Sequence, residues 1–212
     1  MNEDVKYILA MSCVLPAIAG IFRLSAIDKK FHAFIYMMIL VALLETWIYL
    51  GIKFPNLGSL SRLPINIYML LNLALFLFFV YNNGYLGKRK LQLLLLSAVV
   101  VAIFDCIYYR SVYNLFLYLL CFVSVVMLVT CIDILSKQIT EVRYKLTDNF
   151  WFWFSSASIL YNAFNFLIFG VLVFSLMKTK KGQSIADIQH LSNAFSYLLF
   201  TVAILKIPKK DT

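Results

Sequence analysis

Long apolar segments fill almost the whole of this 212-residue chain. A helix needs about 20 predominantly apolar residues to cross a bilayer, because the hydrocarbon core is about 30 Å thick and each helical residue rises about 1.5 Å. The segments that meet this length predict spans over residues 7–24, 34–52, 64–81, 91–108, 112–135, 150–174 and 185–205. The chain is therefore predicted to be one integral membrane domain, residues 1–212, folded as an all-α bundle of seven transmembrane helices.

The composition agrees with a lipid environment. The chain is 63% hydrophobic and only 14% charged, whereas about a quarter of the residues in soluble domains are charged. Stretches such as 98–104 are continuously apolar, without the alternation of polar and apolar residues that β-barrel strands show. The connections between segments are too short to bury a core of their own. The chain is thus expected to contain no kinase, nucleotide-binding or DNA-binding domain.

Basic residues predict the orientation in the membrane. When successive loops are assigned to opposite sides, the larger share of the 19 lysines and arginines falls on one side. The positive-inside rule then predicts an outside N-terminus and a cytoplasmic C-terminus. This rule also accounts for the net charge of +9, so no nucleic-acid partner is expected. Because the leader carries Glu3 and Asp4, unlike the positive leader of a signal peptide, the first segment is predicted to be a retained helix.

Polar residues recur at helical spacing on the last three apolar segments. Residues three or four positions apart share one face of a helix. The stripes are His190, Asn193, Tyr197 and Thr201 on the last segment, Ser155, Ser158, Asn162 and Asn165 on the sixth, and Asn114, Tyr118 and Cys121 on the fifth. Because polar groups are costly in lipid, each stripe is expected to face the interior of the bundle.

Most of these polar side chains are predicted to lie in the outer half of the bilayer, on the basis of the helical rise along each segment. We expect them to line an outward-facing polar cavity that binds a small ligand or a proton. An intramembrane carboxylate is a functional candidate by default, and a histidine can change its charge near neutral pH. The predicted site consists of Glu45, Asp105, Asn162, Asn165, His190, Asn193 and Tyr197. The competing interpretation is that these groups only form hydrogen bonds between helices.

The reactive residues favour a protein that is not an enzyme, and they predict no metal and no cofactor. A zinc site needs several ligands, but the chain has two histidines, and His32 lies outside the predicted spans. The four cysteines show no paired spacing. No lysine stands midway along the last segment, where a retinal Schiff base would need one. The sequence also contains no G-x-S-x-G nucleophile elbow.

The leading hypothesis is a sensory or signalling membrane component. Because no output domain is present, binding in the outer cavity would have to reach a partner through helix shifts. The predicted contacts with that partner are residues 88–90, residues 136–149 and the C-terminal tail. One alternative is a small-solute or proton-coupled transporter with Glu45 as the proton carrier. A second alternative is a membrane-embedded hydrolase that acts on lipid.

Segments in both halves of the chain resemble a family of small seven-helix inner-membrane proteins of Gram-negative bacteria. The resembling residues are Phe34-Ile-Tyr, Glu45, Asn66-Ile-Tyr-Met-Leu, His190-Leu-Ser-Asn193, Tyr197-Leu-Leu-Phe and Ala203-Ile-Leu-Lys-Ile-Pro208-Lys-Lys. In that family a polar residue, often Glu, follows the Asn-Ile-Tyr segment, whereas Leu71 and Asn72 stand there in this chain. The resemblance implies a multi-pass protein of the cytoplasmic (inner) membrane. It also implies a membrane histidine kinase or another signalling protein as partner, because such proteins often occur beside sensor histidine kinase genes.

Overall fold

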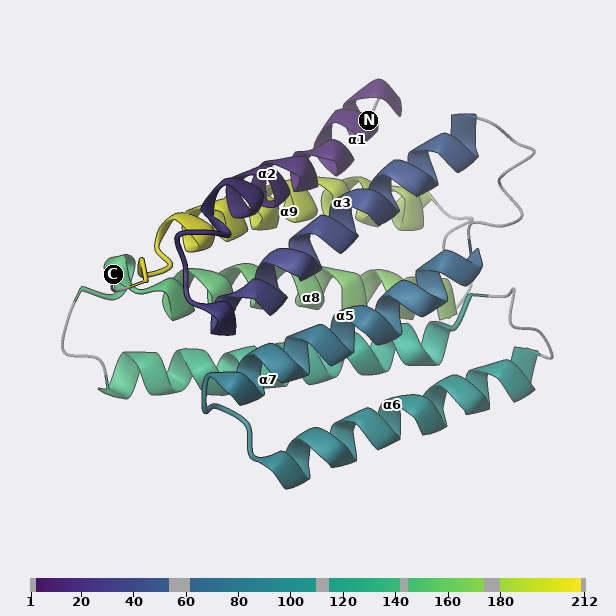
Figure 1. Cartoon of the computed structure of the whole chain (residues 1–212). Helices are drawn as coiled ribbons and strands as arrows, with labels where there is room; N and C mark the ends of the chain where they lie inside the picture. Colours follow the sequence, from purple (N-terminus) through teal and green to yellow (C-terminus); the bar gives the residue numbers. More distant parts are fainter. Residues whose placement is uncertain (1–2, 54–61, 110–114, 142–144, 174–179, 211–212) are drawn as a thin grey trace.

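The computed structural model describes residues 3–53, 62–109, 115–141, 145–173 and 180–210, which form one bundle of helices (Figure 1). The α-helices are α1 (Glu3–Ala10), α2 (Val14–Arg23), α3 (His32–Lys53), α5 (Arg62–Asn82), α6 (Lys88–Tyr109), α7 (Leu117–Glu141), α8 (Phe150–Val173) and α9 (Lys180–Leu205). Short 3-10 turns lie at Met11–Cys13, Lys29–Phe31 and Leu146–Asp148. In these ranges the only β-type pairing is an isolated antiparallel bridge between Ile27 and Lys209. The predicted all-α class is confirmed.

Five helices within the described ranges are long and apolar enough to cross a membrane, which makes the chain compatible with a multi-pass membrane protein. The corresponding segments are Lys29–Leu50, Leu63–Asn82, Lys88–Tyr109, Leu117–Thr140 and Asp187–Leu205. The first segment, Tyr7–Arg23, is a shorter apolar helix. Helix α8 has 24 residues and no charged residue. A bilayer surrounding the bundle would explain why so many large apolar side chains are exposed on its outer surface.

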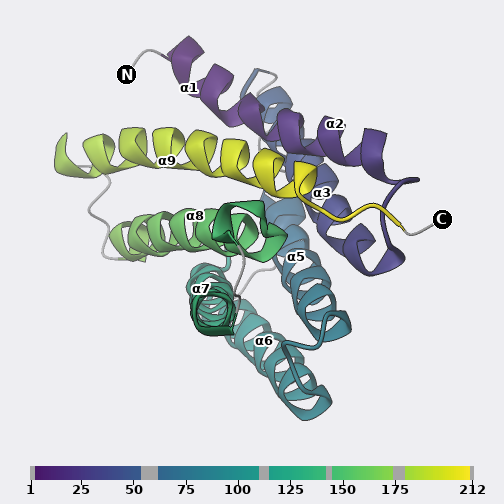
Figure 2. The ribbon, with the colours of Figure 1, turned by 90° about the vertical axis from the view of Figure 1, so that its left-hand side faces the viewer.

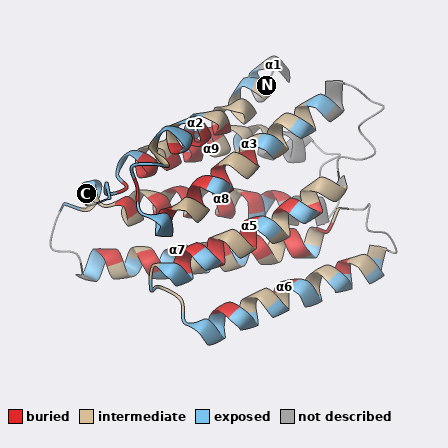
Figure 3. Ribbon diagram, in the orientation of Figure 1, coloured by how far each residue is buried: buried red, intermediate tan, exposed pale blue. Residues whose placement is uncertain are grey.

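The position of each helix in the bundle follows from its packing partners. Helix α8 packs against α7 on one side and α9 on the other, so it is central (Figure 2). In the described residues, helix α6 packs mainly against α5 and α7 and lies at the rim. Figure 3 shows buried positions concentrated on the inward faces of the central helices, with few on α6. The core is rich in aromatic rings, and the rings of Phe34 and Phe154 meet edge to face at 5.1 Å.

The fifth predicted span differs most from the observed helix. The sequence predicts residues 112–135, whereas α7 begins at Leu117 and ends at Glu141. Two side chains from other helices bind backbone N–H groups at the start of α7, and these long-range bonds define where it begins. Asn66 on α5 accepts from the N–H of Phe116, and Asp105 on α6 accepts from that of Leu119. Asn114, which belongs to a predicted polar stripe, lies outside the described residues.

The first apolar segment is not one continuous α-helix. It passes from α1 through the 3-10 turn Met11–Cys13 into α2. Pro16 lacks the N–H group that would donate to the carbonyl group of Ser12, and the proline ring crowds that carbonyl. A 3-10 turn in the middle of a helix is a common response to such a disruption.

Helices α2 and α3 approach each other closely at Gly20. A Cβ atom on this residue would lie 2.8 Å from Cγ2 of Ile35. Small residues permit such close helix packing in membranes. Overpacking of a tight contact typically costs about 1–3 kcal/mol. We therefore expect Gly20→Val to lower the free energy of unfolding by that amount, as measured by reversible unfolding in mixed detergent micelles.

The matched control for this prediction is Gly170→Val. A Cβ on Gly170, which also lies within a helix, would meet nothing within 4 Å. We expect this second substitution to leave the unfolding free energy nearly unchanged. Equal destabilisation by both substitutions would mean that the close approach at Ile35 does not determine the result.

Candidate functional site

A small cavity of about 20 Å³ lies at the centre of the bundle, where side chains from α3, α5, α7, α8 and α9 meet. Most of its exposed lining area is apolar, but about half of its lining residues carry a polar group. The lining residues are Met37, Met38, Val41, Tyr68, Asn72, Met127, Ser158, Tyr161, Asn162, Tyr197 and Phe200. A buried water needs a volume of about 10–15 Å³ and two to four polar partners. The cavity therefore has room for one water molecule.

Three polar atoms in the cavity lining have no hydrogen-bond partner. They are Oδ1 of Asn72, Oγ of Ser158 and the hydroxyl of Tyr197, and all three residues are at least 95% buried. Nδ2 of Asn72 reaches only the sulfur of Met127, at 3.9 Å. The thiol of Cys131, a weak donor, lies beside Ser158. Buried polar atoms in native proteins are nearly always hydrogen-bonded, so these three atoms are suited to bind one shared water.

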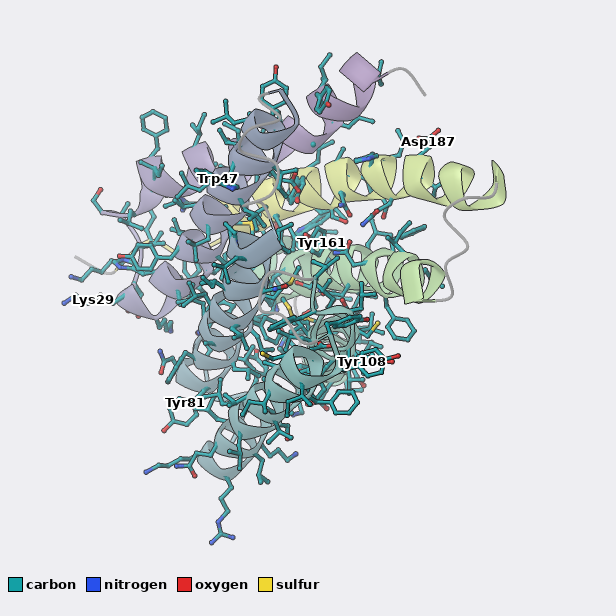
Figure 4. All side chains as sticks on the ribbon, turned by 90° about the vertical axis from the view of Figure 1, so that its right-hand side faces the viewer. Lys29, Trp47, Tyr81, Tyr108, Tyr161 and Asp187 are labelled. Atoms are coloured by element: carbon teal, nitrogen blue, oxygen red, sulfur yellow. The ribbon has the colours of Figure 1, made fainter. Side chains whose placement is uncertain are left out.

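The Glu45–tyrosine cluster, which we define as Glu45, Tyr68, Tyr161 and Tyr197, adjoins this cavity. The hydroxyl of Tyr161 lies beside those of Tyr68 and Tyr197, and the rings of Tyr161 and Tyr197 are 5.8 Å apart. Figure 4 shows Tyr161 in the interior of the bundle. The carboxyl group of Glu45, half-buried on α3, interacts electrostatically with all three tyrosines. Four helices, α3, α5, α8 and α9, thus contribute one titratable side chain each to a shared centre.

The structure brings part of the predicted site together at this centre. Tyr197 and Asn162 line the cavity, and Glu45, which does not line it, interacts electrostatically with Tyr197. Nδ2 of Asn162 donates to the carbonyl oxygen of Ser158 at 2.8 Å, so this amide also forms a hydrogen bond within its own helix. The sequence stripes on the last two segments therefore do face the interior at these positions.

Other predicted residues lie near the cavity but are not among those that line it. Asn165 accepts a hydrogen bond from Nε2 of Gln189 at 2.7 Å. This bond joins α8 to α9, which is what the competing interpretation of hydrogen bonds between helices predicts. Oδ1 of Asn193 is buried and has no partner. His190 is half-buried on α9, beyond the cavity lining.

Asp105 has a different role from the one that the sequence suggested. Its two carboxylate oxygens accept from the backbone N–H groups of Tyr118 at 3.4 Å and Leu119 at 2.7 Å. Asp105 is completely buried, and it is not among the residues that line the cavity. The first N–H groups of any helix lack partners within the helix, and their partial positive charge attracts a carboxylate. Asp105 is therefore a cap for α7 that comes from a neighbouring helix.

The sequence analysis missed Tyr68, Asn72 and Tyr161 as members of the site. Tyr68 and Asn72 stand four positions apart on α5 and so share one helical face, which is a signal that the sequence contains. Tyr161 stands directly before Asn162, a member of the polar stripe on α8. Tyrosine is weak evidence in a membrane segment, because its amphipathic ring is also common at the lipid–water interface.

The chemistry available at this centre is proton exchange and the binding of water. Ligand pockets for organic molecules usually measure about 300–1,000 Å³, far more than this cavity. In the described ranges, no group of three or more His, Cys, Asp or Glu side chains is arranged to hold a metal ion. Comparison with protein-family models, curated proteins and solved structures finds no match for this chain. Function must therefore be argued from the site itself.

Proposed function

We propose that the protein crosses the inner membrane of a bacterium seven times, with its N-terminus outside and its C-terminus in the cytoplasm. The five membrane-capable helices support this topology, and so does the distribution of basic residues. In this arrangement α8 is the sixth span. Its polar side chains are tolerated because α7 and α9 flank it on both sides. The first span consists of α1 and α2.

Within this topology, we infer that the protein is a sensory component that responds to protonation at Glu45. The observation that carries this inference is the convergence of Glu45 and three buried tyrosines beside a water-sized cavity. A change of charge on Glu45 changes its interactions with α5, α8 and α9 at once. Protonation of a buried group can bias the packing of helices in this way, and a partner can read the shift. A membrane histidine kinase that contacts the cytoplasmic helix ends is the kind of partner that fits.

A proton fits the site better than the organic ligand that the sequence also allowed. The cavity of about 20 Å³ admits one water molecule and nothing larger without separation of the helices. A proton needs no cavity, because it moves between a carboxyl group, hydroxyl groups and water along hydrogen bonds. The Glu45–tyrosine cluster supplies the carboxyl and hydroxyl groups.

A proton-coupled transporter is the second candidate, and the same cluster favours it. Glu45 would take up the proton, and the tyrosine hydroxyls would relay it toward the cavity. A transporter of this kind must move protons across the membrane, whereas a sensor need only bind and release them. Proteoliposomes that contain a pH-sensitive dye separate the two. Proton flux that Glu45→Gln abolishes would support the transporter, and no flux would support the sensor.

Infrared difference spectroscopy of the protein in lipid vesicles tests the protonation of Glu45 directly. The pH is stepped between acid and neutral values, and the C=O stretch of a carboxyl group shielded from water is recorded. We expect a band that Glu45→Gln removes. The matched control is Asp133→Asn. The carboxylate of Asp133 is exposed and paired with Lys137, so this variant should retain the band. A band that survives in Glu45→Gln would contradict proton sensing at this residue.

Removal of the Tyr197 hydroxyl tests whether this group has a functional or a purely structural role. This atom has no partner within ordinary hydrogen-bond geometry among the described residues, but it lies beside the hydroxyl of Tyr161. We therefore expect Tyr197→Phe to lower the unfolding free energy by no more than about 1 kcal/mol, the usual contribution of one hydrogen bond. The infrared response of the carboxyl group should nevertheless shift, because its hydrogen-bonded surroundings change. The matched control is Tyr36→Phe at an exposed position on α3, which should leave both measurements unchanged. A stability loss without a spectral shift would favour a purely structural role.

A further inference from the structure

A groove of about 450 Å³ lies on the outer surface of the bundle between α6 and α7, far larger than the central cavity. Most of its exposed lining area is apolar. Its walls include Leu94 of α6 and Val125, Val126 and Val129 of α7. The groove belongs to the rim of the molecule, because α6 packs mainly against α5 and α7 over the part of the chain that the structure describes (Figure 2).

The groove changes in polarity along its length. The N-terminal end of α6 contributes Lys90 to its lining, and the adjacent end of α7 contributes Asp133. Farther along both helices, away from these charges, Leu94 and Val125 are apolar. The groove therefore runs from a charged end, at the level where α6 begins, into an apolar interior at the depth of the hydrocarbon core.

The charge at this end of the groove is positive. Asp133 is paired with Lys137 at 2.9 Å, so its carboxylate does not neutralise Lys90. Lys88 and Arg89 stand beside Lys90 at the start of α6, and all three are exposed. Basic pockets between membrane helices bind the head groups of anionic lipids, and each basic residue near the surface contributes about 1 kcal/mol.

We propose that the groove between α6 and α7 binds one anionic phospholipid, with an acyl chain along Leu94, Val126 and Val129 and the phosphate at Lys90. A lipid matches both the apolar interior and the cationic end, whereas an apolar helix from another protein would leave Lys90 without a partner. The proposal rests on insertion in a membrane but not on proton sensing at Glu45. A sensor, a transporter or any other function is compatible with it.

The test measures how much lipid the protein retains. The full chain is purified from vesicles of phosphatidylglycerol and phosphatidylcholine, and the lipid bound to each molecule is counted by native mass spectrometry. We expect Lys90→Ala to lower phosphatidylglycerol retention about fivefold, which corresponds to about 1 kcal/mol at room temperature. Arg89→Ala removes the same charge one residue away but does not line the groove, so it should have little effect. Equal losses for the two variants would indicate diffuse attraction and overturn the site.

A second pair of variants tests the acyl-chain part of the groove without a change of charge. Val129→Trp should fill the groove and lower retention of both lipids. Its control is Val100→Trp, an equally exposed position on α6 that does not line the groove, and this variant should retain lipid normally. Unchanged retention in Val129→Trp would overturn the proposal. A dimer that Val129→Trp disrupts would assign the groove to a second copy of the chain instead, and would equally overturn it.

Discussion

Asp105→Ala is expected to lower the free energy of unfolding by about 2–4 kcal/mol. The substitution removes both acceptors from the N–H groups of Tyr118 and Leu119, in a position that is fully buried. Hydrogen bonds to charged groups contribute about 1.5–3 kcal/mol each, and an unsatisfied backbone group inside a membrane costs several. Reversible unfolding in mixed detergent micelles gives the difference. Because α7 also packs against central α8, we expect the loss to affect the whole bundle.

Two comparison variants separate capping from a general effect of charge. Asp105→Asn keeps one carbonyl oxygen that can accept from Leu119, so it should recover about half of the loss. Asp133→Ala removes an exposed carboxylate that is paired with Lys137 four residues away on α7. Such surface pairs contribute about 0.3–0.5 kcal/mol, so this variant should remain close to the unmodified protein. If Asp105→Ala were as mild as Asp133→Ala, the cap at α7 would be unimportant for stability.

The sequence predicts the helical class and most helix positions because the length and apolar character of a segment are local properties. The start of α7 is different, because it depends on Asn66 and Asp105, which belong to other helices. Val112, Leu115 and Phe116 extend the apolar segment ahead of Leu117, so hydropathy alone does not place this boundary. Some helix ends are capped by side chains from elsewhere in the fold. Such an end can be located only once the packing is known.

The candidate site shows the same division between local and non-local information. The spacing of Asn162 and Tyr197 along their helices predicts inward faces, and both residues line the cavity. Depth in the membrane grouped Asp105 with them, but depth does not specify the direction in which a side chain points around the helix axis. Asp105 faces the start of α7. Asn72 lines the cavity, although its sequence context assigned it no role.

Arg23 illustrates how a residue can have a role that composition does not indicate. In the sequence it counts only as one of the basic residues that set orientation. In the structure its guanidinium group joins the end of α2 to the end of α9. It donates to the carbonyl oxygens of Ile204 at 2.6 Å and Ile207 at 2.9 Å. The N–H of Lys210 donates to the carbonyl of Ala26 at 2.9 Å, so the segment after α2 is bonded to the segment after α9.

Arg23→Ala is therefore expected to lower the free energy of unfolding by about 2–3 kcal/mol. The last carbonyl groups of a helix have no i→i+4 partner within it, and Arg23 supplies a charged donor to that of Ile204 in the last turn of α9 and to that of Ile207 just beyond the helix. Arg23→Lys should restore only part of the loss, because a compact ammonium group lacks the rigid fork that reaches both oxygens. The matched control is Arg89→Ala, an exposed arginine at the start of α6, which should change stability by less than about 0.5 kcal/mol.

Hydrogen exchange adds a local measurement to this prediction, and it connects the contact to the proposed sensor. Helix α9 carries Tyr197 and ends at the Arg23 contact, so a shift that begins at Glu45 would reach the C-terminal end of α9 along this helix. In Arg23→Ala we expect faster amide exchange in a peptide that covers residues 198–210, while exchange in α7 stays unchanged. Faster exchange throughout the bundle would instead indicate global destabilisation. Unchanged exchange at residues 198–210 would show that the end of α9 is held by its own packing, and a partner could not then read the sensor through the Arg23 contact.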